Sequence, residues 1–494
     1  MQFLWHRYKY YPYEKYLALR EVETLLQPSS ILEVDGGVKV IGVKSAQDVE
    51  RLVYFSAANL SGREVPTTQG LLERANGNGV NRQSTRYSAH GLHEYKGKFN
   101  PQVAKCLLNL FDVRPGAHVL DPFCGSGTSL VEAAHIGVRA TGTDVNPLAV
   151  YLANAKVTAL SIPAAQILEC GLAGIELARR SRLRPKDSND RGRYLAAWFE
   201  PEYLRVMERL HSSFSRAPDG SKEVLLALAS NLLRDYSLQE PSDLRIRRRN
   251  SAYPQVAPFD ACEKAVRQFC SKLEQSQATL GVLSPDARAI LWDCRSPSAH
   301  PDFPKDGFDA ALTSPPYATA LPYIDTQRLS LVWLGLVSPG TISSLEAELI
   351  GSREIRGGAR TILFEALEAN VDGLPPAELG LCRELQAALG DQDGFRRKAV
   401  PRLLYRYFAG MGDAFTSVRR LMRKNASFGL IVGGNHTVLG GNRFEINTPA
   451  HLASIAQSRG WRHVETIPLQ TYQRFGLHAE NATKTEALVV LSAR

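Results

Sequence analysis

The order of apolar and polar segments in the middle of the chain predicts a parallel α/β unit. An apolar run ends at Leu120, glycines follow, and an apolar stretch with helical spacing runs from Ser129 to Ile136. Short apolar runs of this kind fit strands buried on both faces, and glycine permits the positive φ of a tight turn. A second apolar run leads to Asp144. The pattern predicts a strand, a glycine turn, a helix whose first amides face the turn, and a second strand.

Later apolar runs extend this unit into a larger sheet. Strands are predicted to end at Asp293 and at Thr313, and further strands lie in SFGLIVGGN and in TEALVVLSA. Polar residues follow two of these strand ends, where ligands bind in open parallel sheets. The predicted fold class is therefore α/β, with a mostly parallel seven-stranded sheet and helices on both faces.

The segments outside the sheet predict additional domains. The predicted division is an N-terminal α+β domain (1–85), the first part of the core (86–160), a mostly helical insertion and candidate for target recognition (161–285), the second part of the core (286–338), a helical basic insertion (339–424) and the last core strands (425–494). Residues 61–89 are rich in Gly, Asn, Ser and Thr, which is typical of a linker or mobile loop. Aromatic residues crowd the first 16 positions and either pack together or stack on nucleic acid.

The turn before Ser129 predicts a nucleotide-type cofactor site. Its glycines do not follow G-x-G-x-x-G, and no Gly-Lys-Ser/Thr follows, so the pattern points away from NAD and ATP. Asp144 stands at the tip of the next strand, where a carboxylate can accept both ribose hydroxyls. Cys124 lies inside the turn and is interpreted as a packing residue.

Composition narrows the class of protein and its partners. Apolar residues make up 44% of the chain and charged residues 22%, which are ordinary globular values, and the net charge of +9 suits a polyanionic partner. The chain has no run of 18 apolar residues and no signal-peptide pattern, so we expect a cytoplasmic protein that does not contact a membrane. Its seven cysteines form no C-x-x-C pair, so neither a metal site nor a disulfide framework is predicted.

Arginines gather in the two predicted insertions. One group lies between Arg245 and Arg249, and between Arg396 and Lys424 nine Lys or Arg accompany a single acid, Asp413. Such clusters either neutralise nucleic-acid phosphates or form solvated surface. The candidate nucleic-acid-binding residues are Arg245, Arg247, Arg248, Arg249, Arg396, Arg397, Arg419 and Arg420.

The stretch TSPPY, residues 313–317, is the most specific chemical signal in the chain. Two prolines forfeit two amide donors and end a β-ladder, so the backbone there is rigid. The exocyclic amino group of a base is a poor nucleophile because its lone pair is conjugated into the ring, so a catalyst must accept its hydrogens and align it. The Ser314 hydroxyl and the Pro315 carbonyl can be these acceptors, and Tyr317 can stack on a base extruded from its helix. The predicted catalytic residues are Ser314, Pro315, Pro316 and Tyr317.

These stretches together resemble the S-adenosylmethionine-dependent DPPY/SPPY amino-methyltransferases. DPFCGSGT, residues 121–128, resembles motif I, Asp144 matches the acid of motif II, Asp293 the position of motif III, and TSPPY motif IV. Lys98 and Phe99 match the Lys-Phe-x-Pro loop of motif X, which in this family folds over the methionine end of the cofactor. The resemblance covers about 90–160, 286–338 and the last strands, and it implies a Rossmann-like methyltransferase fold.

The resemblance also implies a cofactor and its binding residues. The cofactor is S-adenosylmethionine, held by Lys98, Phe99, Asp121, Pro122, Phe123, Gly125, Gly127, Thr128, Asp144, Asn146, Asp293 and Thr313. Serine in the first position of motif IV is usual in cytosine N-4 enzymes, and aspartate in adenine N-6 enzymes. The favoured prediction is therefore a DNA cytosine N-4 methyltransferase, with a separate restriction or defence subunit as a candidate partner.

Three alternatives to this prediction stay open. One is an adenine N-6 DNA methyltransferase. Another is a tRNA or other RNA guanosine N-2 methyltransferase, because those enzymes share a D-P-F-C-G-type motif I and carry an extra N-terminal α+β domain. The third is an inactive subunit that binds the cofactor and contributes DNA binding to a larger assembly.

Overall fold

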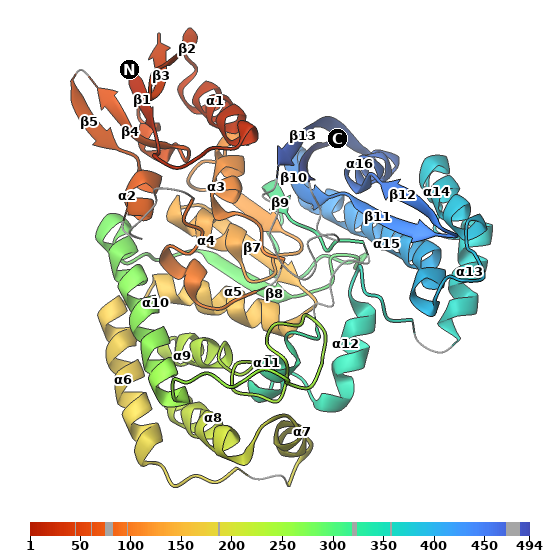
Figure 1. The fold of residues 1–494 in the computed structure, drawn as a ribbon. Helices are drawn as coiled ribbons and strands as arrows, with labels where there is room; N and C mark the ends of the chain where they lie inside the picture. Colours follow the sequence, from red (N-terminus) through yellow and green to blue (C-terminus); the bar gives the residue numbers. More distant parts are fainter. Residues whose placement is uncertain are drawn as a thin grey trace.

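The structure is a computed structural model that describes residues 1–44, 46–60, 62–74, 83–95, 97–185, 188–318, 324–355, 358–470 and 485–494. A central sheet lies between a small N-terminal sheet and a group of helices (Figure 1). Part of the segment predicted as a linker, residue 61 and residues 75–82, lies outside the described residues.

The central sheet has seven strands, of which one runs opposite to the others. In spatial order they are β13 (Trp461–Gln470), β14 (Thr485–Ala493), β10 (Met422–Gly433), β9 (Phe308–Thr313), β6 (His118–Asp121), β7 (Arg139–Asp144) and β8 (Ala287–Leu291). The pairs from β10 to β8 are parallel, and β14 is antiparallel to both of its neighbours. The predicted α/β class and the Rossmann-like methyltransferase fold are confirmed.

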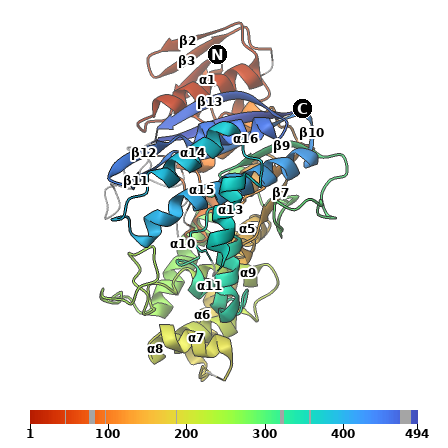
Figure 2. The same ribbon diagram turned by 90° about the vertical axis from the view of Figure 1, so that its right-hand side faces the viewer.

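Helices cover both faces of this sheet because successive strand residues point to opposite sides. Val119 packs with one group of helices, α3 (Pro101–Leu110), α4 (Thr128–His135) and α5 (Pro147–Leu160). Its neighbour Leu120 packs with α15 (Phe395–Leu421) and α16 (Thr448–Ser458). Figure 2 shows α15 and α16 in front of the sheet. The near-continuous apolar runs of these strands are thereby buried on both sides.

The N-terminal domain is a five-stranded antiparallel sheet with two helices. Its elements are β1 (Gln2–Trp5), α1 (Pro12–Leu26), β2 (Ser30–Val34), β3 (Gly37–Ile41), the 3-10 turn η1 (Val49–Arg51), β4 (Phe55–Leu60), β5 (Arg63–Pro66) and α2 (Thr68–Arg74). Trp5 stacks on Phe55 with ring centroids 4.4 Å apart, so this part of the aromatic cluster packs inside the domain. Apolar residues of α1 share a core with α3 and β13, which fixes the domain to the central sheet.

Helical segments interrupt the sheet at two places. Between α5 and β8 lie α6 (Ala164–Arg180), α7 (Asp190–Trp198), α8 (Pro201–Phe214), α9 (Ser221–Ser230) and α10 (Pro258–Leu280). Between β9 and α15 lie α11 (Arg328–Trp333), the 3-10 turn η3 (Pro339–Thr341), α12 (Ile342–Glu348), α13 (Ala359–Ala369) and α14 (Pro376–Ala387). The remaining elements are the 3-10 turn η2 (Ser88–Gly91) and a hairpin of β11 (Asn435–Leu439) and β12 (Asn442–Ile446).

Among the described residues, no single helix is both long and apolar enough to span a membrane, although α5 and α6 pass together as a bent pair on length and composition.

Candidate active site

A pocket opens at the carboxyl ends of β6, β7, β8 and β9. This is the edge at which open parallel sheets bind ligands. Eleven of the residues predicted for the site line it: Lys98, Phe99, Pro122, Phe123, Gly125, Thr128, Asp144, Asn146, Asp293, Ser314 and Pro316. Asp121, Gly127, Thr313, Pro315 and Tyr317 are not among its lining residues.

The turn after β6 forms the floor of the pocket and requires its glycines. Gly125 and Gly127 have φ of 47° and 79°, a region that side-chain-bearing residues rarely adopt. A Cβ on Gly127 would lie 2.8 Å from the Cβ of Ala153, so α5 approaches the turn closely. A Cβ on Gly125 would lie 3.2 Å from the Tyr95 ring, so Tyr95 lies over the turn. The turn and the loop before α3 therefore bound the same space.

Asp144 ends β7 and helps to hold this turn in place. Its carboxylate accepts hydrogen bonds from the Gly125 amide (3.0 Å) and from the Asn146 amide (2.9 Å). A carboxylate offers about four lone-pair directions, so acceptor capacity remains toward the pocket. Burial raises the pKa of Asp144 to about 6, and at neutral pH the group is largely ionised.

Asp121 and Thr313 lie behind the pocket wall. The Asp121 carboxylate accepts hydrogen bonds from Ser129 Oγ (2.5 Å) and Thr313 Oγ1 (2.6 Å), and both Asp121 and Thr313 are buried. Because Thr313 ends β9 and Asp121 ends β6, these hydrogen bonds join the end of β9 to the glycine turn that follows β6. Burial raises the pKa of Asp121 to about 6. In this structure the two residues connect the walls of the pocket and do not face its interior.

The TSPPY segment contributes to the pocket through alternate residues. Ser314 and Pro316 line it, whereas the Tyr317 hydroxyl donates a hydrogen bond to Glu486 Oε1 on β14 (2.6 Å). Behind the segment, Asn435 Nδ2 donates to the carbonyl of Ala318 (2.7 Å). Contacts from β14 and from β11 therefore hold Tyr317 and Ala318, the residues that follow the two prolines.

Asp293 lines the pocket and forms an ion pair with Arg295. Arg295 donates hydrogen bonds to both carboxylate oxygens, the shortest from Nη2 at 2.6 Å. Burial alone would raise the pKa of Asp293, but the hydrogen bonds from Arg295 outweigh it and lower that pKa. Trp292 lies beside it in the lining and provides a flat apolar surface. This part of the lining suits an aromatic ring with a polar edge, because Trp292 can stack on the ring and Asp293 can accept hydrogen bonds from its edge.

The predicted arginines lie at separate places. Arg245, Arg247 and Arg248 are exposed, and of these Arg247 pairs with Asp243 and Arg248 donates to the Ala197 carbonyl. Arg249 is the most engaged: it donates to four backbone carbonyls, those of Arg234, Asp235, Ser237 and Ala252, and so holds its own loop together. Arg396 and Arg397 begin α15 and Arg419 and Arg420 end it, which at 1.5 Å per residue puts the pairs about 33 Å apart. Burial and the positive charges of Arg245 and Arg396 lower the pKa of Arg353. The beginning of α15, which carries Arg396, therefore lies near the loop of residues 231–257, which carries Arg245.

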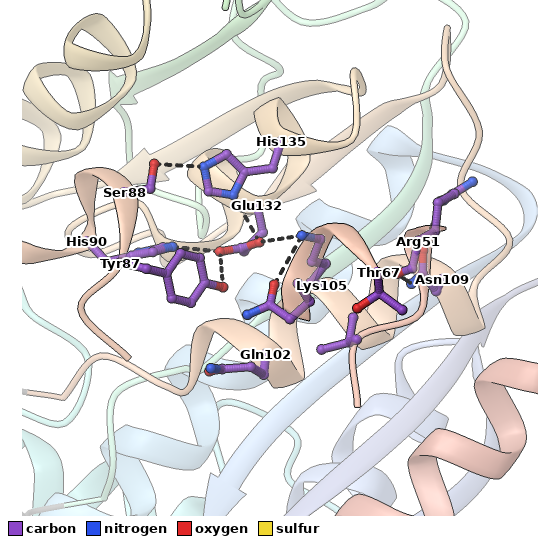
Figure 3. Close-up of polar contacts among 12 residues, drawn as sticks. Arg51, Thr67, Tyr87, Ser88, His90, Gln102, Lys105, Asn109, Glu132 and His135 are labelled. Atoms are coloured by element: carbon purple, nitrogen blue, oxygen red, sulfur yellow. Dashed lines mark hydrogen bonds and ion pairs between the residues drawn. The ribbon is translucent and has the colours of Figure 1, made fainter. Parts of the chain in front are cut away.

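Sequence reasoning missed a buried polar network behind the pocket (Figure 3). The Glu132 carboxylate accepts hydrogen bonds from Tyr87 Oη (2.7 Å) and His90 Nε2 (2.6 Å), and it lies 3.2 Å from His135 Nδ1 and 3.9 Å from Lys105 Nζ. Burial alone would raise the pKa of Glu132, but these partners lower it well below its ordinary value. A lone acid inside the apolar helix SLVEAAHI was the signal that could have revealed the network.

Three comparisons with known proteins bear on what this pocket does. A family model described as an RMKL-like methyltransferase domain matches residues 92–180. The type II methyltransferase M.MvaI of Kocuria varians is 27% identical over 279 residues, which are 51% of this chain and 59% of that protein. M.AvaI of Nostoc sp. is 22% identical over 420 residues, which are 79% of this chain and 84% of that protein.

The tRNA (guanine(6)-N2)-methyltransferase of Thermus thermophilus is 32% identical over 150 residues, 28% of this chain and 42% of that protein. The chain thus spans less than two thirds of M.MvaI and of this tRNA enzyme. Together the matches support a methyltransferase of the amino-methyltransferase type, whose members use S-adenosylmethionine. They leave the modified base and the kind of nucleic acid open.

Proposed function

We propose that the protein transfers a methyl group from S-adenosylmethionine to the exocyclic amino group of a base in DNA, with cytosine N-4 as the favoured position. One observation carries the proposal: Ser314 and Pro316 of TSPPY line the same pocket as the glycine turn and Asp144. A donor held by the turn and an amino group held at Ser314 would therefore meet within a single cavity.

The donor side of the pocket fits S-adenosylmethionine. The absence of a side chain at Gly125 lets Tyr95 lie close over the turn, and both residues line the pocket. Asp144 would offer its carboxylate to ribose hydroxyls. Asp293 and Trp292 would receive the adenine, and Lys98 and Phe99 the methionine part. When bound, the cofactor supplies the methyl group to the amino nitrogen.

The acceptor side would orient the amino group. The Ser314 hydroxyl and the Pro315 carbonyl accept its two hydrogens, which directs the nitrogen lone pair toward the donor side. These acceptors matter most as positive charge develops on the nitrogen, because acceptors stabilise that charge. The rigid two-proline backbone and the contacts of its neighbours to β14 and β11 keep the acceptors in place.

Serine at position 314 favours cytosine over adenine, since the resembled family usually has serine for cytosine N-4 and aspartate for adenine N-6. DNA is favoured over RNA because the match to the type II methyltransferase M.AvaI extends over 79% of this chain, whereas the match to the tRNA enzyme extends over 28%. The tRNA guanosine N-2 reaction is the second candidate, favoured by the higher identity of that shorter match.

An inactive DNA-binding subunit is the weaker alternative. Asp121, Ser314 and both turn glycines are present, and their contacts assemble a complete pocket. A non-catalytic chain would have no need of a hydroxyl at the cofactor pocket.

The test is the identity of the methylated nucleoside. The protein is incubated with labelled S-adenosylmethionine and either duplex DNA or tRNA, and the products are digested and separated by mass spectrometry. N4-methylcytosine in DNA, absent with the Ser314→Ala variant, is the expected result. N6-methyladenine or N2-methylguanosine would replace the base assignment, and labelling in neither substrate would reject the proposed activity.

A further inference from the structure

Two lysines in the described part of the chain are almost completely buried, and they differ in their partners. Lys105 on α3 is 1% exposed, donates to Gln69 Oε1 (3.1 Å) and lies 3.9 Å from the Glu132 carboxylate. Lys156 on α5 is 0% exposed, and among the described residues its Nζ makes one hydrogen bond, to Ser126 Oγ (2.8 Å), and no ion pair. Buried ammonium groups are normally paired with an anion, so Lys156 lacks the partner that Lys105 has.

The packing of α5 explains why Lys156 reaches the cofactor turn. Ala153 lies against Gly127 so closely that a Cβ there would clash, and Lys156 follows Ala153 by three residues on the same face of the helix. Its side chain therefore passes behind the turn and ends at Ser126. The amine is held at the back of the pocket wall, where water does not reach it.

Ser126 lies between this amine and the pocket. It is 2% exposed, lines the pocket, and accepts its hydrogen bond from Lys156. Among the described residues its own hydroxyl donates no hydrogen bond, so the proton is available to a ligand acceptor. The hydrogen bond from Lys156 strengthens the hydroxyl as a donor, because an oxygen that accepts a hydrogen bond has a more polarised O–H bond.

A second amine gives this end of the pocket a positive character. Lys98 lines the pocket, and its Nζ donates to the carbonyl of His90 (3.4 Å). Burial and the Lys98 ammonium lower the pKa of Lys156 well below its ordinary value. Asp144 and Asp293 line the same pocket. A ligand that carries a carboxylate to pair with the amines and hydrogen-bond donors to pair with the acids matches these charges.

We propose that Lys156 is a positioning residue that holds the Ser126 hydroxyl as a donor to the carboxylate of the methionine part of the cofactor. The proposal rests on the function proposed above and adds the residues that would select for the carboxylate. Lys156 acts through Ser126, and Ser126 would touch the ligand. The ligand carboxylate thereby completes the charge pairing that the free protein leaves open at Lys156.

The test compares two ligands by isothermal titration calorimetry. S-adenosylhomocysteine carries the carboxylate, and S-adenosyl-3-thiopropylamine is the same molecule without it. The wild-type protein should bind the first more tightly by roughly 10- to 100-fold, the range for a hydrogen bond to a charged group. Lys156→Met and Ser126→Ala should each lose most of this ratio by weakening only the carboxylate-bearing ligand.

Lys105→Met is the matched control. It removes the other buried lysine, which contacts Glu132 and not the turn, so it should lower stability while the ratio between the two ligands stays as in the wild type. If Lys156→Met does not fold, Ser126→Ala alone decides. Equal weakening of both ligands by Ser126→Ala, or a wild-type ratio near one, would overturn the proposal. Failure of the wild type to bind either ligand would instead reject the cofactor itself, so the two failures are distinguishable.

Discussion

Ser314 and Tyr317 are three residues apart, and their side chains meet different surroundings. Ser314 faces the pocket, whereas the hydroxyl of Tyr317 is held by Glu486 on the antiparallel strand β14. A tyrosine ring anchored at its hydroxyl end loses rotational freedom before a base arrives. In the proposed reaction, Ser314 would therefore be the hydrogen-bond acceptor and Tyr317 an oriented stacking ring.

Replacing Ser314 by alanine should reduce turnover by about 10²- to 10³-fold with little change in cofactor affinity, because the lost hydrogen bond matters most in the transition state. Single-turnover kinetics and calorimetry with S-adenosylhomocysteine measure the two quantities separately. Full activity in Ser314→Ala would overturn the amino-group mechanism.

The anchor of Tyr317 should affect capture of the base more than the methyl transfer. Tyr317→Phe keeps the ring and removes the hydrogen bond, so KM for DNA should rise roughly fivefold, equivalent to ~1 kcal/mol, with kcat almost unchanged. Glu486→Gln retains an acceptor oxygen and should behave like the wild type. Tyr317→Ala also removes the stacking surface and should cost about 1 to 3 kcal/mol of base binding, measured with a fluorescent base analogue at the target position. A Tyr317→Phe variant with normal KM and low kcat would contradict this division.

Asp144→Ala should weaken S-adenosylmethionine binding by roughly 1 to 3 kcal/mol because charge-assisted hydrogen bonds to the ribose are lost. The substitution also removes the acceptor of the Gly125 amide, so circular dichroism must first establish that the variant is folded. Unchanged affinity in a folded variant would remove Asp144 from the cofactor site.

At the scale of elements, the buried network around Glu132 joins parts that are distant in the sequence. It connects the loop before α3 through Tyr87 and His90, α3 through Lys105, and α4 through Glu132. From Lys105 it continues to Gln69 on α2 and on to Glu73. Hydrogen bonds and the ion pair of Lys105 with Glu132 therefore link the N-terminal domain to α4, the helix that begins at the glycine turn.

Glu73 gives this connection a pH dependence. Burial raises its pKa from 4.5 to about 7, so the folded state binds a proton more tightly than the unfolded state. The stabilisation is fully present below pH 4.5 and is lost as the pH rises through about 7, by up to about 3 kcal/mol. Glu73→Gln keeps the acceptor oxygen and should flatten this decline. Urea denaturation at pH 5, 6, 7 and 8 measures it, and parallel curves for the two proteins would contradict the assignment.

At the scale of the whole molecule, the exposed arginines should govern how salt affects DNA binding. Converting Arg245, Arg247 and Arg248 to Gln should reduce the slope of log Kd against log salt by about one unit for each lost phosphate contact. Arg249→Gln serves as the comparison, since Arg249 is bound to backbone carbonyls and should affect stability and not the slope. Fluorescence anisotropy with duplex DNA over a salt series provides the data, and an unchanged slope in the triple variant would leave this cluster as solvated surface.

The sheet and the pocket could be predicted from the sequence because their signals are local. Strands buried on both faces are continuous apolar runs, and ligand residues follow strand ends directly, as Asp144 and Ser314 do. Residues that act through distant partners left no such pattern. Glu486 meets Tyr317 across 169 positions, and Thr313 meets Asp121 across 192.

The arginines show the same limit on sequence-based prediction, because residues of one type and one segment differ in their positions and contacts. Arg396 and Arg420 belong to the same basic segment of the sequence, but they lie at opposite ends of a helix of 27 residues. Arg249 was equivalent to its neighbours by residue type, and only its contacts distinguish it. Lys156 and Glu132 carried a usable signal, a single ionisable residue within an apolar helix, which predicts a buried polar contact but not its partner.

The position of β14 constrains the order in which the central sheet can be completed during synthesis. β13 is translated before β14 but reaches the rest of the sheet only through it, because β14 lies between β13 and β10. Glu486, which holds Tyr317, lies on the same strand. A nascent chain can therefore form the glycine turn and its helices before β14 has joined the sheet and anchored Tyr317. Because β14 carries both the ladder to β10 and Glu486, its pairing with β10 and the anchoring of the Tyr317 ring depend on the same strand.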